Sequence, residues 1–386
     1  NGPGRNGFRI GDADSTQVAV IINAGFTLGE GEAYSFITYS GRESNSGAFY
    51  RNPAGSGAAL DDGENVVVDG FLPNINSEID DFSFNGGYRI DFEDDSSLDM
   101  SFTTGRNSID YVTSNSANYS FVNELNFGQG LSDADIRAQI PREAFAYGLE
   151  LTLETINLDY TTSLGGAFLA IGAELREDGY RITPGVEYAW RDYDTDADGN
   201  ALYPQNASGG IQGFPGISPS NSVDETRNVV SFYGDLEYEV TDNLLVNGAI
   251  RYDDYDGFGD TTNFKLAGNL RVTDTFRLRG AASTGFRAPS MQQLYFNNIS
   301  TQFIGGVQVE TGTFRNDSAL ARAIGIPELK EEESTNLSLG AVVDISDHWD
   351  IAIDFYSIDI DDRIVISNNL GFGLSDALDA ALTAAG

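Results

Sequence analysis

The feature that most constrains this chain is the alternation of apolar and polar residues from about residue 227 onwards. In the segment 244–252, Leu244, Val246, Gly248, Ile250 and Tyr252 alternate with mostly polar residues. Neighbouring side chains of a β-strand point to opposite faces, so the pattern predicts strands with one apolar face and one polar face. The same alternation recurs at 230–240, 262–272, 275–286, 335–345 and 349–360. Each segment has about ten residues, the length of a tilted strand that crosses a bilayer.

The connections between these segments are of two kinds. Short turns are expected at 241–243, 273–275 and 346–348, and longer links lie between them, including about forty residues between Arg287 and Lys330. Charged residues occur in the middle of the polar faces, where a packed core could not accept them but a wet lumen could. Short turns on one rim and long loops on the other are typical of a barrel in an outer membrane.

The N-terminal half gives weaker signals of the same kind. Further strands are predicted at 18–28, 33–42, 79–90, 97–106, 148–160 and 166–176, which makes about twelve strands in all. We therefore predict an all-β fold, a transmembrane antiparallel β-barrel with short periplasmic turns and long extracellular loops at roughly 43–77, 106–146, 177–226 and 288–330. Short helices are expected at 131–140, at 316–325 with Asp317 as its cap, and at 374–386.

Composition excludes several classes of function. The chain has no Cys and a single His, His348, which excludes disulfides, thiolate or His-cluster metal sites and a cysteine nucleophile. A formal charge of -37 disfavours nucleic acid as a partner. No paired carboxylates, phosphate loop or nucleophile elbow is evident, so we expect no enzyme and no required cofactor. No apolar run approaches the ~18 residues of a membrane helix, but barrel strands carry a much weaker signal.

Three stretches carry a resemblance to a known family. They are "GFRAPSMQQL" (285–294), "LKEEESTNLSLG" (329–340) and "DFYSIDIDDRIVIS" (354–367), and in this order and spacing they resemble the barrels of TonB-dependent outer-membrane receptors. The resemblance covers nearly the whole chain. One departure is Glu331, which stands where the family usually has Pro.

The resemblance implies a 22-stranded barrel around an N-terminal plug domain, in the outer membrane of a Gram-negative bacterium. We expect residues 1–386 to be one part of that barrel, with the plug and the last strands outside this sequence. The implied partners are the lipid bilayer, a small-molecule ligand, TonB with its inner-membrane energising complex and, as a further option, a surface lipoprotein. The implied function is uptake of a scarce nutrient: a metal chelate or siderophore, a vitamin or an oligosaccharide.

Two other functions stay open on the sequence alone. A passive porin shares the alternation and the loop asymmetry but needs no plug. An acidic, calcium-stabilised secreted adhesin would instead pack its apolar strand faces internally. The resemblance also disfavours haem as the ligand, because haem receptors of the family use a His in the loop after the motif at 285–294 and no His lies between Pro289 and Leu329.

Candidate ligand-binding residues come from the strand ends and the loops. Arg287 falls on the lumen side in line with Arg277 and Arg279, where it can pin loop carboxylates or the plug, or contact a ligand. Aromatic residues of the loops can stack on a ligand or pack against other loops, and the sequence does not decide between the two. The candidates are Tyr203, Phe214, Tyr295, Phe296 and Phe303.

One acidic segment resembles the opening of a calcium loop. Asp194, Asp196 and Asp198 alternate before Gly199, but Gln205 stands where the closing Glu of an EF-hand is required. The segment therefore predicts either a looser structural calcium site in an extracellular loop or a solvated acidic tip. A second acidic cluster, 253–260, predicts a tight turn that contains Gly.

Overall fold

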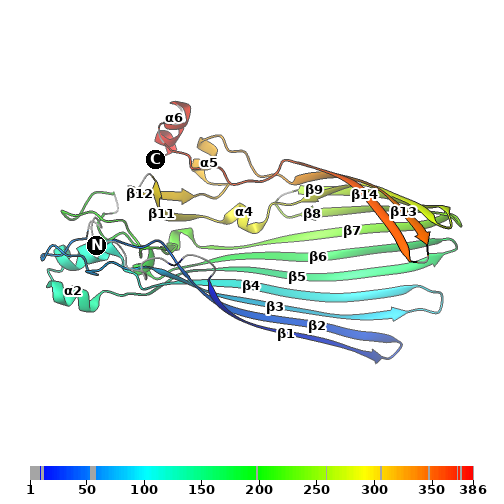
Figure 1. Ribbon diagram of the computed structural model, residues 1–386, viewed down its shortest axis with the longest axis horizontal. Helices are drawn as coiled ribbons and strands as arrows, with labels where there is room; N and C mark the ends of the chain where they lie inside the picture. The colour runs from blue at the N-terminus through cyan, green and yellow to red at the C-terminus, as the bar shows by residue number, and fades with distance from the viewer. Residues whose placement is uncertain are drawn as a thin grey trace.

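The computed structural model contains one large antiparallel sheet (Figure 1). It describes residues 9, 13–52, 58–196, 199–257, 259–304, 307–346, 348–371, 373 and 376–385. Twelve strands pair in chain order, with β1 and β14 at the two edges of the sheet, and β11 and β12 form a separate hairpin. The sheet strands are β1 (Asp14–Leu28), β2 (Gly31–Gly47), β3 (Asn74–Asp91), β4 (Ser97–Ser114), β5 (Ala144–Leu164), β6 (Ala167–Pro184), β7 (Val223–Thr241), β8 (Leu244–Tyr255), β9 (Gly259–Thr273), β10 (Phe276–Arg287), β13 (Glu332–Ser346) and β14 (Trp349–Asp361).

Strand number and turn positions confirm the predictions, but the predicted strand length was wrong. The sheet strands have 12 to 21 residues rather than about ten. The first three long loops are accordingly shorter than expected, at 48–73, 115–143 and 185–222, whereas the fourth, at 288–331, agrees with the predicted 288–330. At the end of the sheet that carries the long loops, β8 and β9 are joined by a tight turn and not by a long loop. This is the turn predicted from the acidic cluster, and Gly257 has φ +73° in it.

One face of the sheet carries a continuous apolar band. The registers place Phe102, Ile156 and Leu175 side by side on β4, β5 and β6, and Ile250 beside Phe264 on β8 and β9. Exposed members of this band include Val20, Ile22, Phe82, Met100, Ile156, Leu175, Phe232, Ile250, Phe264, Leu339 and Ile353. Because no described element packs on this face, the internal packing expected of a secreted adhesin is not found, and the band fits contact with lipid.

The extra strand length lies above this band, towards the long loops. There the same face becomes charged, with Arg106 of β4 paired to Glu150 of β5 at 2.5 Å and Arg181 of β6 paired to Asp224 of β7 at 3.2 Å. Charged side chains on the outer face are costly within the bilayer and cheap outside it. The strands therefore continue beyond the bilayer, which the alternation of apolar residues alone did not reveal.

The opposite, inner face is polar and held by interactions that reach across three strands. Tyr233 of β7 lies over Gly172 of β6 and donates a hydrogen bond to Asp159 of β5 at 2.5 Å. A Cβ at Gly172 would lie 2.5 Å from the Asp159 carboxylate and 2.7 Å from the ring carbon of Tyr233 that bears the hydroxyl, and it would clash with the adjacent ring carbon, so only glycine leaves room for the ring. We call this arrangement, a long side chain that crosses a glycine to reach an aspartate, a clasp.

The clasp occurs three times on the inner face. Tyr34 of β2 crosses Gly87 of β3 to reach Asp99 of β4 at 2.7 Å. Arg279 of β10 crosses Gly340 of β13 to reach Asp354 of β14, with its shorter contact at 2.7 Å. Each clasp fixes the register of two strand pairs at once, because a slip by one residue would move the glycine from under the side chain.

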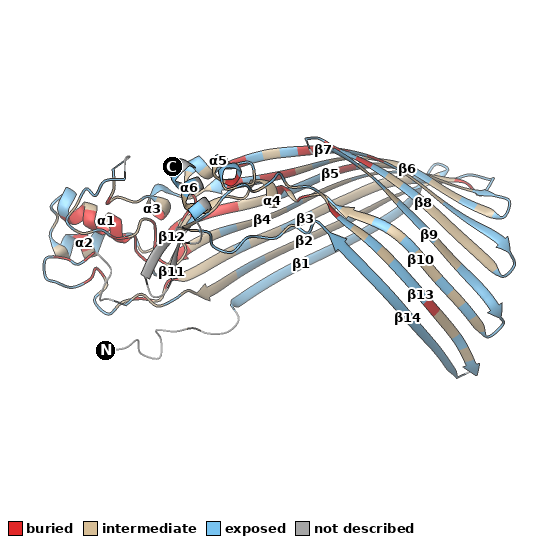
Figure 2. Cartoon of the chain, turned by 90° about the horizontal axis from the view of Figure 1, so that it is seen from above, coloured by how far each residue is buried: buried red, intermediate tan, exposed pale blue. Residues whose placement is uncertain are grey.

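Short helices lie in the loops at one end of the sheet, where most buried residues also gather (Figures 1 and 2). They are α1 (Tyr119–Asn123), α2 (Asp133–Gln139), α3 (Glu187–Trp190), α4 (Met291–Tyr295), α5 (Ala319–Ala323) and α6 (Asp376–Ala385), with short π and 3-10 turns at Glu124–Gly128 and Pro219–Asn221. The helices predicted near 131, 316 and 374 are confirmed. Ser318 rather than Asp317 caps α5, because the Ser318 hydroxyl accepts from the Ala321 N–H. No helix in the described part of the chain is long and apolar enough to cross a bilayer.

Candidate ligand-binding site

The loops at the outer end of the strands form a packed body with its own apolar core. Residues of the loops 48–73 and 115–143 supply most of the core, and Ala207 of the loop 185–222 completes it. Its fully or nearly fully buried members are Ala58, Leu60, Val66, Phe71, Ala117, Tyr119, Val122, Leu125, Ile136, Ile140 and Ala207. Loops with a shared core hold a defined shape, as a binding surface requires.

Polar contacts join the same loops. Asn118 caps α1 by accepting from the Phe121 N–H, and its amide donates to the carbonyls of Tyr188 and Arg191 at 3.0 and 2.9 Å. Arg137 of α2 forms a two-bond ion pair with Asp62 of the loop 48–73, at 2.8 and 3.1 Å. Because Asn118 is fully buried and its bonds link two loops, it fixes their relative position.

The aromatic candidates of the loop 185–222 both take part in packing. The Tyr203 hydroxyl donates to the Glu124 carboxylate, and this hydrogen bond raises the pKa of Tyr203 to about 12. Phe214 contacts the rings of Tyr111 and Tyr147, with centroids 5.0 and 5.4 Å away, and these two rings also contact each other at 5.1 Å. Both side chains are half-buried, so each keeps some surface with which it can contact a ligand.

Two aromatic candidates of the loop 288–331 pack on the barrel wall, against the same apolar cluster as Phe214. Tyr295 and Phe296 pack on a second apolar cluster that contains Tyr180, Ile182 and Met291, and the Arg315 guanidinium lies 4.9 Å from the centre of the Tyr295 ring. Phe303 belongs to β11 (Asn298–Ile304), which pairs with β12 (Val307–Thr313). The side chain of Phe303 lies outside what the structure describes.

Arg287 stands on the inner face at the last residue of β10. Its guanidinium contacts the Glu332 carboxylate of β13 at 3.5 Å, and the other Glu332 oxygen accepts from the Ile364 N–H at 2.9 Å. Glu332 is nearly buried, whereas the side chain of Arg287 is 61% exposed. Arg287 therefore contacts a carboxylate of the neighbouring strand and not one of a loop, and it offers an exposed cation to the lumen. Its role in ligand binding stays a prediction.

A second arginine, Arg227 of β7, holds the start of the loop 288–331 and was not singled out from the sequence. It donates to the Pro289 carbonyl and to the Asp178 carboxylate, both at 2.8 Å, and its guanidinium lies 5.1 Å from the centre of the Tyr255 ring. Arg176 lies on the same ring at 5.6 Å. The alternating polar residues of β7 mark Arg227 as inward-facing, but no local signal reveals a partner 62 residues away.

The acidic segment 194–199 is divided between two environments. Asp194 is fully buried and accepts hydrogen bonds from Asn123 at 2.8 Å and from the Ala207 N–H at 2.6 Å, and burial raises its pKa to about 6. Asp196 accepts from the backbone and side chain of Asn200. Asp198 lies outside the described residues, and among those described no group of three or more acidic or His side chains could hold a metal. The calcium site stays a prediction.

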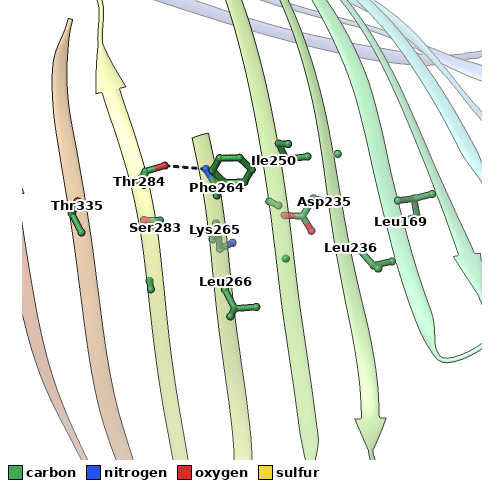
Figure 3. Close-up of a pocket in the computed structure, with 14 residues that line it drawn as sticks. Leu169, Asp235, Leu236, Ile250, Phe264, Lys265, Leu266, Ser283, Thr284 and Thr335 are labelled. Carbon is green, nitrogen blue, oxygen red and sulfur yellow. Dashed lines mark hydrogen bonds between the residues drawn. The ribbon is translucent and has the colours of Figure 1, made fainter. Parts of the chain in front are cut away.

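One depression in the described surface lies away from these loops. It has a volume of about 590 Å³ and sits on the apolar outer face, above Gly234 and Gly248 and between Leu236, Ile250 and Leu266 (Figure 3). It belongs to the surface that meets lipid, so it is not a candidate for the nutrient site. An antiparallel sheet with an apolar outer face, a polar inner face and a loop body at one end defines the wall of an outer-membrane β-barrel.

Comparison with known proteins agrees with this class. The family model described as TonB dependent receptor-like, beta-barrel, matches residues 22–381, so the chain belongs to the TonB-dependent receptor β-barrel family. No curated protein sequence matches the chain. Members of the family are transporters and receptors of the Gram-negative outer membrane, not enzymes.

Solved structures show the same fold at low sequence identity. The ferric-catecholate import receptor Fiu from E. coli K12 matches with a TM-score of 0.50 and 11% identity, over 90% of this chain and 52% of that one. The RagAB peptide transporter matches with a TM-score of 0.52 and 12% identity, over 89% of this chain and 40% of that one. The chain thus spans about half or less of the length of these receptors.

Proposed function

We propose that this chain forms part of an outer-membrane receptor that binds a scarce nutrient between its extracellular loops and imports it with energy supplied through TonB. Family membership and the packed loop body carry the proposal. In this proposal Arg287, Phe214, Tyr295 and Phe296 form the part of the binding surface next to the barrel wall, and Tyr203 forms the part in the outer loops. A metal chelate such as a siderophore, a vitamin and an oligosaccharide remain the ligand classes to test.

A surface lipoprotein over the mouth is a further proposed partner. It is supported by the similarity of the fold to that of the RagAB peptide transporter. Copurification from native membranes after mild detergent extraction tests it. A stoichiometric lipoprotein band is expected, and isolation of the receptor alone at the same detergent concentration would contradict it.

Uptake by cells tests the import function. The full-length receptor is produced in a bacterium that lacks its own catecholate and cobalamin receptors, and accumulation of an iron-labelled ferric catecholate, cobalamin and a labelled oligosaccharide is measured with and without TonB. We expect one probe to accumulate only when TonB is present. Equal accumulation without TonB would favour the porin.

Two arginine variants localise the site. Arg287→Gln removes the exposed cation at the mouth and should lower uptake, whereas Arg106→Gln changes a charged pair on the outer face and should not. Surface abundance, measured by labelling intact cells, controls for loss of folded receptor. Equal uptake by both variants at equal abundance would remove Arg287 from the site.

A further inference from the structure

The inner faces of β9 and β10 carry positive charge only. From 261 to 271 the inward residues of β9 include Lys265 and Arg271 but no acidic residue, and those of β10 include Arg277, Arg279 and Arg287, also without an acidic residue. We call these five side chains the basic stripe. Its uniform sign is unusual in a chain with 59 acidic and 22 basic residues.

Cations of the basic stripe follow one another along the whole wall. Arg287 stands at the loop end, Lys265 pairs across the strands with Ser283, and Arg279 and Arg277 follow towards the short turns. Four residues of a strand span about 13 Å, so consecutive cations lie about 7 to 13 Å apart along the wall. Figure 3 shows Lys265 and Ser283 on their neighbouring strands.

Part of the basic stripe lacks a counter-charge. Arg279, Arg287 and Arg277 have carboxylate partners on β13 and β14, although the Arg277 contact is long at 3.7 Å. In the described portion of the chain, no ion pair involves Lys265 or Arg271. Asp235 lies in the same row as Lys265 but two strands away, and it accepts a hydrogen bond from Asn247 at 2.6 Å.

Arg271 and Arg277 also stand directly opposite each other on neighbouring strands. Like charges in directly opposed positions destabilise a sheet. Within the described wall only the long 3.7 Å contact of Arg277 with Asp344 offsets this repulsion, and Arg271 has no carboxylate partner there, so the pair favours an anion in the lumen. The long loops, by contrast, each carry more acidic than basic residues.

From this arrangement we infer that the basic stripe binds an anionic solute in the lumen and that the imported nutrient is an anion, such as a carboxylate-bearing chelate. The inference rests on the proposed import function and names its substrate class. The stripe supplies cations from the mouth to the short-turn end, so a multivalent anion can exchange one contact for the next.

Thermal unfolding of the purified full-length receptor in detergent tests the inference. Citrate is the anionic probe and maltotriose the neutral one, at ionic strength held constant with NaCl. Citrate in excess of its dissociation constant is expected to raise the Tm of the wild type by about 2 °C, because a ligand that binds only the folded state stabilises it. Maltotriose should have no effect at the same concentration.

Variants assign the effect to the stripe. Arg271→Gln and Lys265→Gln should abolish the citrate shift, and Arg271→Gln alone should raise the Tm without citrate because it removes the like-charge pair. The matched control Arg106→Gln, on the outer face, should keep the shift. An equal shift in all variants, or none in the wild type, would overturn the inference.

The inference would also be overturned if Arg271→Gln lowered the Tm and citrate had no effect. That result would indicate that an acidic segment of the protein packs on the basic stripe. The measurement does not involve TonB. Absence of a citrate effect therefore does not contradict the import function, and absence of uptake in cells does not contradict anion binding by the purified receptor.

Discussion

Gly172→Ala perturbs one clasp without changing charge. The new Cβ would lie 2.5 Å from the Asp159 carboxylate and 2.7 Å from the hydroxyl-bearing ring carbon of Tyr233, and it would clash with the adjacent ring carbon. The ring must therefore move, and its hydrogen bond to Asp159 is lost. Overpacking costs about 1–3 kcal/mol, and a hydrogen bond to a charged group contributes about 1.5–3 kcal/mol. We expect a destabilisation of roughly 2.5–6 kcal/mol.

Gly234→Ala is the matched control on the next strand. A Cβ there would meet only the Ile171 side chain at 3.8 Å, an ordinary contact. Thermal unfolding of the full-length receptor in detergent, followed by circular dichroism of the sheet, gives the comparison. Equal Tm values for Gly172→Ala and Gly234→Ala would refute the clasp.

A double variant separates the two contributions. Once Tyr233→Phe has removed the hydroxyl, Gly172→Ala can no longer break that hydrogen bond and should cost less than it does in the wild type. The coupling energy between the two sites is expected to be about 1–2 kcal/mol. Additive effects would show that the ring and the glycine act independently.

Three further changes test the loop body. The raised pKa of Asp194 means that the folded state binds the carboxyl proton more tightly than the unfolded state does. The free energy of unfolding should therefore fall by about 3 kcal/mol as pH rises from about 4 to about 6. Thermal unfolding of Asp194→Asn should not show this fall. Arg227→Gln removes the contact with Pro289 and should raise hydrogen exchange in the α4 segment, with exchange in β1 unchanged. Tyr203→Phe loses the hydrogen bond to Glu124. The free energy of unfolding should fall by about 1 kcal/mol, and the Tm should fall with it.

The strand pattern was predictable because lipid and lumen impose opposite chemistry on alternate residues. Leu266 and Lys265 are neighbours in sequence and lie on opposite faces, and the sequence alone placed them so. The same logic put Arg287 on the inner face. Strand ends were not predictable, because above the bilayer both faces are polar and the alternation around Arg106 disappears.

Contacts between distant segments could also not be predicted from the sequence. Asp194 was interpreted as one of three aspartates in a single loop, but its partners are Asn123 and Ala207, 71 and 13 residues away. The role of Gly172 depends on residues of two other strands. Such positions carry no local signal, because the glycine or aspartate has a use only once the strands have paired.

Accessibility of alternate residues tests the central claim, that this sheet separates lipid from a polar lumen. The chain has no Cys, so single cysteines introduced as Phe264→Cys, Lys265→Cys and Leu266→Cys can each carry a spin label in the full-length receptor in lipid nanodiscs. Collision with oxygen, which concentrates in lipid, should dominate at 264 and 266, and collision with a water-soluble nickel chelate at 265. Equal accessibility at all three positions, or the reverse order, would contradict the account.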